Sequence, residues 1–194
     1  MVKQFGMDEY EFAVHETKTH SVIDDVKNLK SEIGILYVND FNRKIMMKLF
    51  SENNLEFHEI LHCGIYAYIW KGHPLADKNE ISIEELQEYP FISLVEGTGT
   101  HDHYTKFFYD NDLHFSLDME ASTTDQVLAM VQSNLGLGFY PEQLASEYIM
   151  RGEIFPVSLH ESVPERDIIL IRESRHAESI AAKKLINFLK HTTN

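Results

Sequence analysis

The chain has 194 residues, 43% of them hydrophobic and 25% charged, and 31 acidic residues against 17 lysines and arginines give a net charge of −14. This composition is typical of a folded protein with one ordinary domain or two small lobes. Such a negative charge argues against direct binding to nucleic acid and to anionic membranes, which attract basic surfaces. No apolar run approaches the ~20 residues that a membrane-spanning helix needs.

Cys63 is the single cysteine of the chain, so no internal disulfide can form. The first residues, MVKQFGMDEYEF, contain no apolar segment of the kind found in secretory signals. We therefore expect a cytoplasmic protein. The alternative is a mature secreted chain from which a signal has been removed.

Strand-like and helix-like segments alternate along the chain. The first half predicts a strand at 10–16, a helix within 20–30, a strand at 32–38, a helix at 42–54, a strand or strand pair at 56–70, and a short helix capped by Ser82 and Glu85. The second half predicts a strand at 90–95, a helix around Tyr104, Phe107 and Phe108, a strand at 115–120, a helix from Thr123, a helix from Pro141, strands at 153–159 and 166–173, and a last helix.

The apolar stripes of two of these helices can be named. Ile45, Leu49 and Phe50 are expected on one side of the helix at 42–54. The last helix is expected to bury a face that consists of Ala181, Leu185, Phe188 and Leu189. Strands that alternate with helices indicate parallel sheets covered on both faces, hence an α/β fold.

An internal echo appears when the chain is shifted by 104 residues. The shift places Glu16 on Glu120, Thr19 on Thr123, and Gly34 on Gly138. Both segments consist of a predicted strand, a threonine-rich turn, a helix and a strand with a glycine. We therefore predict two similar α/β lobes.

Residues 122–143, STTDQVLAMVQSNLGLGFYPEQ, raise the question of a nucleotide-binding loop. Thr123 and Gln126 stand at capping-box spacing, Gly136 suits the left-handed position after a helix, and Gly138 suits a close backbone approach. A phosphate-binding loop would need Lys-Ser/Thr after the second glycine, and a dinucleotide fingerprint has its glycines before the helix. The structural explanation of the glycines is therefore favoured.

The beginning of this helix is more suggestive of a ligand. Ser122, Thr123 and Thr124 supply hydroxyls beside free backbone N–H groups, and Thr17 and Thr19 do the same at the earlier helix. A helix N-terminus attracts anions, and open α/β sheets bind ligands beyond the carboxyl ends of their strands. We expect a small, anionic ligand between two such lobes. Simple capping is the alternative for each hydroxyl.

Five stretches, in this order and spacing, resemble the effector-binding domain of LysR-type transcriptional regulators. They are VIDDVKNLKSEIGIL, HPLA, ISIEELQEYPFI, QVLAMVQSNLGLGFYPEQLA and AAKKLINFLK. The resemblance covers almost the whole chain. It implies two Rossmann-like subdomains joined by two crossover strands, similar to type 2 periplasmic binding proteins, with 1–70 and 166–194 as subdomain I and 71–165 as subdomain II.

The same resemblance implies that a small effector binds between the subdomains and changes the geometry of a homodimer or tetramer. By position, the ligand-binding residues would be Thr17, Thr19, Ser93, Glu96, Gly97, Thr98, Thr123, Phe139, Tyr140 and Pro141. The hydroxyls favour a carboxylate or phosphate, and Phe139 and Tyr140 would accept an apolar portion. No cofactor is implied.

Family members also carry a winged helix-turn-helix and a linker helix, and they begin this domain with a strand and a helix that MVKQFGMDE does not match. We therefore expect a fragment whose first subdomain is incomplete at its N-terminus. Contact with DNA would be made only through a domain outside this sequence.

Histidines and cysteine suggest two possible metal sites, at His58, His62 and Cys63 and at His101 and His103. In a strand, His58 and His62 lie on one face and Cys63 on the other, and no second cluster with zinc-finger spacing exists. The sequence HDH at 101–103 is expected to begin a helix in solvent. No metal site is predicted.

No catalytic residues are predicted either. The chain has no Gly-x-Ser-x-Gly elbow, and Cys63 lies in a predicted strand. The sequence GTGT at 97–100 is either an oxyanion-binding turn or a plain turn. The leading hypothesis is a ligand-sensing regulatory domain and not an enzyme. The alternatives are a solute-binding protein of a transporter and, less favoured, an enzyme on the same scaffold.

Overall fold

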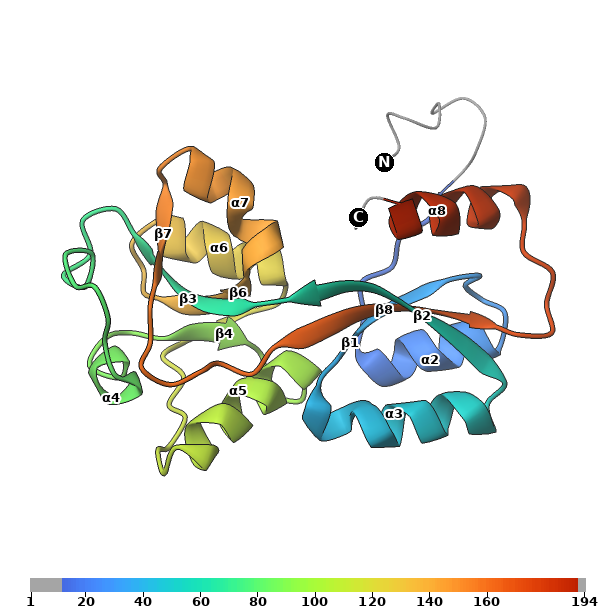
Figure 1. Ribbon diagram of the computed structural model, residues 1–194, viewed down its shortest axis with the longest axis horizontal. Coiled ribbons are helices and arrows are strands. Elements are labelled where there is room, and N and C mark those ends of the chain that lie inside the picture. Colours follow the sequence, from blue (N-terminus) through green and yellow to red (C-terminus); the bar gives the residue numbers. More distant parts are fainter. Residues whose placement is uncertain (1–11, 192–194) are drawn as a thin grey trace. The chain divides into compact units, whose positions relative to one another are not determined.

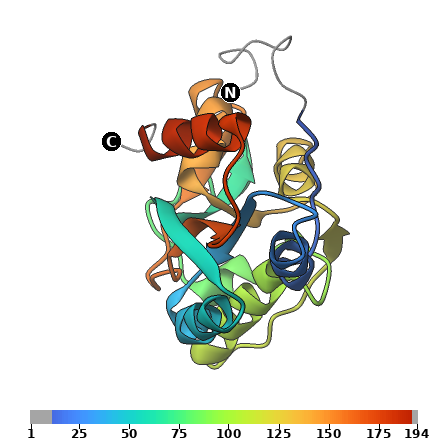
Figure 2. The ribbon, with the colours of Figure 1, turned by 90° about the vertical axis from the view of Figure 1, so that its right-hand side faces the viewer.

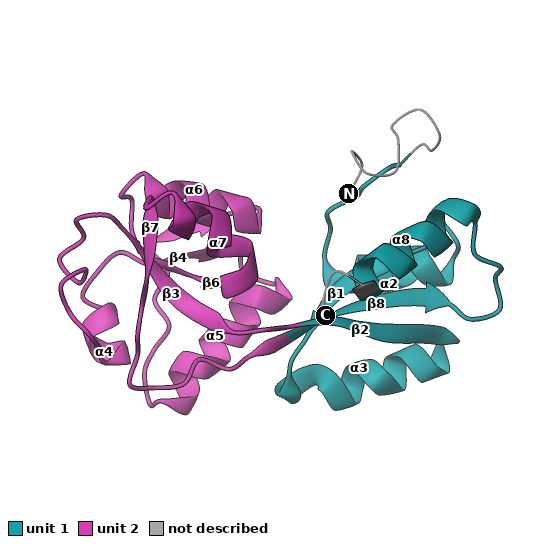
Figure 3. Cartoon of the chain, turned by 45° about the horizontal axis from the view of Figure 1, so that its top comes forward, with its two compact units in different colours: residues 1–61, 167–194 teal, residues 62–166 magenta. Residues whose placement is uncertain are grey.

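The computed structural model describes residues 12–191. The chain divides into two compact units, which Figure 3 distinguishes by colour: unit 1 contains Met1–Leu61 and Asp167–Asn194, and unit 2 contains His62–Arg166. The mixed α/β architecture confirms the predicted fold class. The subdomain limits expected from the resemblance, 1–70 with 166–194 and 71–165, stay a prediction.

Unit 1 is built on a three-stranded sheet with the order β1-β8-β2. Its elements are α2 (Thr19–Lys27), β1 (Gly34–Val38), α3 (Asp40–Glu52), β2 (Leu55–Cys63), β8 (Arg166–Glu173) and α8 (Ile180–His191). β1 pairs with β8 in antiparallel orientation, with Leu36 opposite Ile169. Two layers of helices cover this sheet, α2 and α3 on one face and α8 on the other (Figures 1 and 2).

The alternation of side chains along β8 explains this arrangement. Ile169 and Ile171 are buried among residues of α2 and α3, whereas Leu170 is buried with Ile186 of α8. Because successive side chains of a strand point to opposite faces, one apolar run serves both layers. The run Ile168–Ile171 therefore reads as continuous hydrophobic sequence.

Unit 2 contains β3 (Ile65–Trp70), α4 (Ile83–Leu86), β4 (Ile92–Leu94), α5 (Gly99–Asp110), β5 (Met119–Ala121), α6 (Thr124–Gln132), β6 (Gly138–Pro141), α7 (Glu142–Met150) and β7 (Ile154–Val157). β3 lies between β6 and β7 and is antiparallel to both. β4 and β5 are parallel, and a parallel bridge between Phe91 and Leu137 connects this pair to β6.

Helices cover both faces of the unit 2 strands (Figure 1). One core cluster combines β3 with α4 and α5 and is rich in aromatic residues, among them Phe91, Phe107 and Phe139. The other combines β4 and β6 with α6 and α7, among them Ile92, Val127 and Tyr140. The two clusters correspond to the two faces of the strands, as Phe139 and Tyr140 show by pointing in opposite directions.

The expectation of parallel sheets is only partly right. β4 and β5 are parallel, whereas β3 runs antiparallel to both of its neighbours and β8 runs antiparallel to β1. Parallel neighbours require a helical crossover between them. β3 follows β2 after a single residue, Gly64, but it lies in another sheet, between β6 and β7.

The strand predicted at 10–16 is not formed over its described part. Residues 12–18 are irregular, and residues 10 and 11 lie outside the described residues. A strand forms only when a neighbour satisfies its backbone N–H and C=O groups. In the part of unit 1 that the structure describes, the strands that pair are β1, β8 and β2.

Two predicted helix stripes are shifted from the buried ones. In α3, Met46 and Phe50 are buried, whereas Ile45 is 69% exposed. In α8, Ala182 and Ile186 are buried instead of Ala181 and Leu185. Apolar residues stand next to each other in both helices, so the spacing rule permits two neighbouring faces and packing selects one.

The glycine after α6 has a different role from the predicted one. Asn134 takes the left-handed conformation, with φ of 60°, and Gly136 does not. A Cβ atom on Gly136 would lie 2.5 Å from the carbonyl oxygen of Pro90, and the Leu137 N–H donates to that same oxygen over 2.9 Å. Gly136 is therefore required because another backbone segment comes close to it. This is the role that was predicted for Gly138, and Gly138 has it too, since a Cβ atom added there would lie 2.9 Å from the Ile92 carbonyl oxygen.

Gly136→Ala is expected to lower the free energy of unfolding by about 1–3 kcal/mol, because the new methyl group meets backbone that cannot retreat. Urea unfolding measures the loss. Gly64→Ala is the matched control, since its Cβ would first meet the Tyr66 side chain at 3.3 Å. Equal urea midpoints for the two variants would show that the backbone of Pro90 can make room for a methyl group at residue 136.

Candidate functional site

Two helices of unit 2 begin next to each other at the carboxyl ends of parallel strands. α5 follows β4 and α6 follows β5, and these strands pair in register with Ser93 opposite Glu120. The carboxyl edge of a parallel sheet is where α/β proteins bind ligands, and helix N-termini present free N–H groups there. The candidate site therefore consists of the residues at this edge, here called the α5–α6 edge: Ser93–Thr100 and Ser122–Thr124.

Thr123 caps α6, as predicted. Its hydroxyl accepts from the Gln126 N–H over 3.4 Å. The reciprocal bond of the predicted capping box is different, because the Gln126 side chain accepts from the N–H of Ser122 over 2.8 Å. The helix start is confirmed, and the side-chain oxygen of Gln126 closes the turn before it.

Thr98 caps α5 and is fully engaged in doing so. Its hydroxyl donates to the Val95 carbonyl oxygen over 2.9 Å and accepts from the His101 N–H over 3.2 Å. Glu96 and Gly97 are exposed in the preceding turn, where Gly97 has a φ of 79°. That left-handed conformation favours glycine, so Gly97 has a conformational role.

The predicted residues of unit 1 are in a simpler setting. Thr17 is exposed in the irregular segment 12–18, and Thr19 is the first residue of α2. The N-cap position of α2 is occupied by Lys18, and its side chain makes no capping hydrogen bond. The helix start is where the sequence predicts it, but the predicted hydroxyl cap is not formed.

The remaining predicted residues are buried. Phe139 is 3% exposed, with its ring centroid 4.8 Å from that of Tyr104 and 5.2 Å from that of Phe91. Tyr140 is 2% exposed and donates its hydroxyl to Asp125 over 3.1 Å. Pro141 ends β6 and is the N-cap of α7. Ser93 is 2% exposed and occupies the middle of β4.

Arg166 is a functional candidate that sequence reasoning missed. It is 3% exposed, donates from Nη1 to the Thr100 hydroxyl oxygen over 3.0 Å, and donates from Nη2 to the Thr100 carbonyl over 3.4 Å. Its guanidinium lies 4.9 Å from the Tyr104 ring centroid, a favourable cation–π distance. A buried positive charge is thereby fixed at the first turn of α5.

His103 lies beside this charge and is itself 3% exposed, which corrects the expectation that HDH faces solvent. Its Nε2 is 2.9 Å from the Pro164 carbonyl oxygen. Burial, assisted by the charge of Arg166, lowers the pKa of His103 to about 3. His103 is therefore neutral at physiological pH. Its spacing of four residues from Phe107 on the apolar face of α5 is the signal that could have predicted its burial.

The histidines do not assemble a metal centre in the part of the chain that the structure describes, where no three His, Cys, Asp or Glu side chains are placed to share an ion. β2 contains His58, His62 and Cys63, as predicted. His62 lies 2.6 Å from Glu165, and Cys63 is buried.

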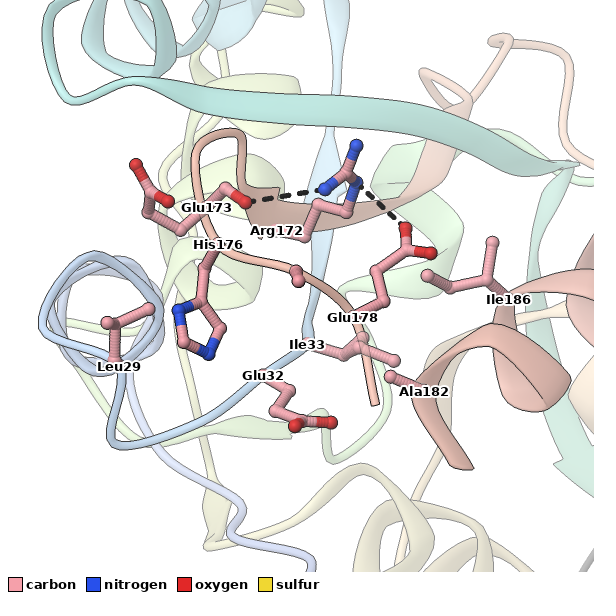
Figure 4. Close-up of a pocket in the computed structure, with 10 residues that line it drawn as sticks. Leu29, Glu32, Ile33, Arg172, Glu173, His176, Glu178, Ala182 and Ile186 are labelled. Carbon is pink, nitrogen blue, oxygen red and sulfur yellow. Dashed lines mark hydrogen bonds and ion pairs between the residues drawn. The ribbon is translucent and has the colours of Figure 1, made fainter. Parts of the chain in front are cut away.

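Three of the hollows among residues 12–191 lie within single units. The one in unit 1 that Figure 4 shows is lined by Arg172, Glu178 and Ile186, among others; Arg172 and Glu178 are 3.1 Å apart in an ion pair. Its volume of about 20 Å³ has room for a water molecule only. A second hollow in unit 1, of about 530 Å³, lies at the ends of α2 and α3 and mixes Lys27 and Arg175 with Glu52 and Glu173.

The third hollow, in unit 2, has about 310 Å³ and lies between β3 and residues 157–165. Glu161 and Glu165 line it, so it is poorly suited to an anion. None of these three hollows is lined by a residue of the predicted site. The α5–α6 edge and these three hollows therefore consist of different residues.

The residues that the structure describes include no helix with the length and apolar character that crossing a bilayer requires. The fold is that of effector-binding domains with the architecture of type 2 periplasmic binding proteins. The family model for the LysR substrate binding domain matches residues 8–194. The chain belongs to this family, which confirms the resemblance seen in the sequence.

Curated relatives are transcriptional regulators. The chain is 23% identical over 169 residues to an uncharacterized HTH-type transcriptional regulator, YnfL, of Escherichia coli (strain K12), a match covering 86% of this chain and 55% of the relative. It is 24% identical over 139 residues to a probable RuBisCO transcriptional regulator of Chlorokybus atmophyticus, covering 67% and 44%. The chain thus spans about half the length of these relatives.

Solved structures share the fold. The regulatory domain of CcmR from Synechocystis PCC6803 in complex with 2-PG has a TM-score of 0.76 and 16% identity, covering 100% of this chain and 89% of that one. The effector binding domain of QuiR in complex with shikimate has a TM-score of 0.71 and 18% identity, covering 98% and 85%. At such identities the likeness concerns the fold.

Proposed function

We propose that this chain is the effector-sensing regulatory domain of a LysR-type transcriptional regulator and has no enzymatic role. It binds a small anionic metabolite and passes the signal, through the geometry of a homodimer or tetramer in the cytoplasm, to a DNA-binding domain outside this sequence. The family match and the HTH-type relatives support the regulatory role. The acidic composition agrees with a chain that does not itself contact DNA.

One observation carries the anionic nature of the effector. α5 and α6 both begin at the carboxyl edge of the parallel pair β4–β5, so two helix N-termini of unit 2 point to the same edge. Helix N-termini favour negative charge. Shikimate and 2-phosphoglycolate, which two neighbours bind, both carry a carboxylate, and this chemistry suits such an edge.

Isothermal calorimetry with shikimate, 2-phosphoglycolate and inorganic phosphate tests this proposal. We expect saturable binding of at least one acid and about tenfold weaker binding by Thr123→Val, because the valine keeps the shape and loses a hydrogen bond to a charged group. Thr123→Ser keeps the hydroxyl and is expected to bind like the natural chain. Unchanged binding by the valine variant would refute the contact at Thr123.

Signalling needs a second measurement, because an effector shifts an equilibrium only when it binds the two states with different affinity. We expect the identified acid to change the affinity of a version with the DNA-binding domain for operator DNA.

A solute-binding protein of a transporter is the rival on the same fold. The upstream reading frame separates the two, since a helix-turn-helix supports the regulator and a secretory signal supports the transporter component.

A further inference from the structure

The third hollow, of about 310 Å³ and here called the β3 hollow, lies where the pairing of β3 with β7 stops. It is lined by residues 64–67, 157–163 and 165. The last paired residues are Ala67 and Val157. In this antiparallel register, Ile65 and Leu159 would be the next residues to exchange backbone hydrogen bonds. The described residues form no hydrogen bond between these two, so the β3 hollow is an interruption in the sheet.

The backbone groups of Ile65 point into the β3 hollow. On the opposite edge of the strand, the Glu142 N–H donates to the Gly64 carbonyl oxygen over 3.0 Å. Successive residues of a strand direct their N–H and C=O groups to opposite edges, so those of Ile65 are directed to the β7 side. Ile65 is 4% exposed, and buried backbone groups in folded proteins have a partner from the chain, from water or from a ligand.

The backbone groups of Leu159 point into the β3 hollow from the other side. The Ser158 carbonyl accepts from the Ile81 N–H, and the His160 N–H donates to the Ile81 carbonyl, both over 3.0 Å. Leu159 stands between these two residues, so its own N–H and C=O are directed away from Ile81 and towards β3. Two N–H groups and two C=O groups therefore face the same hollow.

The side chains around the β3 hollow give it a negative charge. Glu161 and Glu165 line it, and His160 is the one basic side chain among its described lining residues. The carboxylate of Glu161 is held in place, because its Oε2 accepts from the Ile83 N–H over 2.9 Å. The β3 hollow therefore suits a ligand that carries a positive charge.

An extended peptide can satisfy all of these groups at once. A strand presents N–H and C=O groups along both of its edges, so an inserted segment can pair with Ile65 on one edge and with Leu159 on the other. A volume of about 310 Å³ is more than one water molecule needs and lies within the range of ligand sites. A lysine or arginine side chain on this segment would complement the carboxylates.

We propose that the β3 hollow binds an extended, basic peptide segment of a partner protein. The backbone of the segment pairs with Ile65 and Leu159, and its lysine or arginine lies beside Glu161. This inference does not rest on the proposed function, because no residue of the α5–α6 edge lines the β3 hollow. It assigns to unit 2 a protein-binding surface in addition to the effector site.

The test uses the peptide acetyl-Val-Lys-Val-amide as the probe and follows the backbone amide resonances of the 194-residue chain. We expect the Ile65 and Leu159 amides to shift with saturation. Methylation of the lysine amide nitrogen in the peptide should weaken binding at least about fivefold, because it removes a hydrogen bond and obstructs strand pairing. The peptide acetyl-Val-Glu-Val-amide, with the opposite charge, should not saturate.

Glu161→Gln tests the charge of the hollow from the side of the protein. Glutamine keeps a carbonyl oxygen for the Ile83 N–H and removes the charge, so we expect about threefold weaker binding of the lysine peptide. Glu147→Gln is the matched control, since it removes the same charge from an exposed position of α7 outside the hollow and should leave the affinity unchanged. The amide spectrum shows whether each variant is folded, and the three peptides test the inference on the natural chain alone.

Three results would overturn the inference. The lysine peptide could shift neither amide, or the methylated or glutamate peptide could bind as well as the lysine peptide. In the third case, the Ile65 and Leu159 amides would shift with increasing chain concentration in the absence of peptide, which would assign the β3 hollow to a second copy of this chain instead of a partner.

Discussion

Replacing Phe139 with alanine is expected to lower the free energy of unfolding by about 3–5 kcal/mol. Phe139 was predicted to line a ligand pocket, but its ring lies among those of Phe91, Tyr104, Phe107 and Phe108, at centroid distances of 4.8 to 6.3 Å. Removal of the ring leaves a cavity that these neighbours fill only in part, and it also removes the edge-to-face contacts.

Chemical denaturation measures this loss. Phe139→Leu keeps most of the volume and should cost clearly less than alanine. Phe155→Ala is the control on a half-exposed phenylalanine of β7, where 37% exposure makes the expected loss small. A stable Phe139→Ala variant with altered effector affinity would contradict the core role and support the predicted pocket role.

Acid is expected to destabilise the protein through His103. Burial holds its pKa at about 3 in the folded chain, against about 6.5 in an unfolded one. Between these values the unfolded chain binds a proton that the folded chain does not. The contribution of neutral His103 to the free energy of unfolding is therefore complete above pH 6.5. It falls as the pH decreases towards 3, by up to about 1.4 kcal/mol per pH unit.

The matched variant is His103→Gln, which does not titrate and keeps an amide in place of the imidazole beside the Pro164 carbonyl. Between pH 7 and pH 5 the natural chain should lose about 2 kcal/mol more than this variant, measured by urea unfolding at each pH. Other titrating groups are common to both chains and cancel in the difference. Parallel stability curves would mean that folded His103 protonates freely.

Local features of the fold were predictable wherever the signal depends on neighbouring residues. The capping box of Ser82 and Glu85 is formed, with the Ser82 N–H 3.0 Å from Glu85 Oε2. The strand predicted at 166–173 matches β8. The glycines of the echo, Gly34 and Gly138, each begin a strand, and a Cβ atom added to either would meet valines of the helix before that strand.

Features that depend on distant partners were not predictable. Met46 is buried and Ile45 is exposed, although both are apolar and adjacent. β3 pairs antiparallel with β6, with Ala67 opposite Phe139, so its neighbour is a strand far away in the sequence. The spacing predicted a helix stop at Gly136, whereas in the structure a Cβ atom added there would lie 2.5 Å from the Pro90 carbonyl oxygen.

The sequence by itself determined the family, the α/β class and the helix beginnings at Thr19 and Thr123, because caps, periodicity and motif order are properties of neighbouring residues. Only the tertiary structure decided which partners the hydroxyls of the α5–α6 edge have. Thr98 and Thr100 look alike in GTGT, and they differ because Arg166, 66 residues from Thr100 along the chain, donates to Thr100 alone. The hydrogen-bond partners of a side chain depend on which groups lie near it in space, and the order of residues in the sequence does not show this.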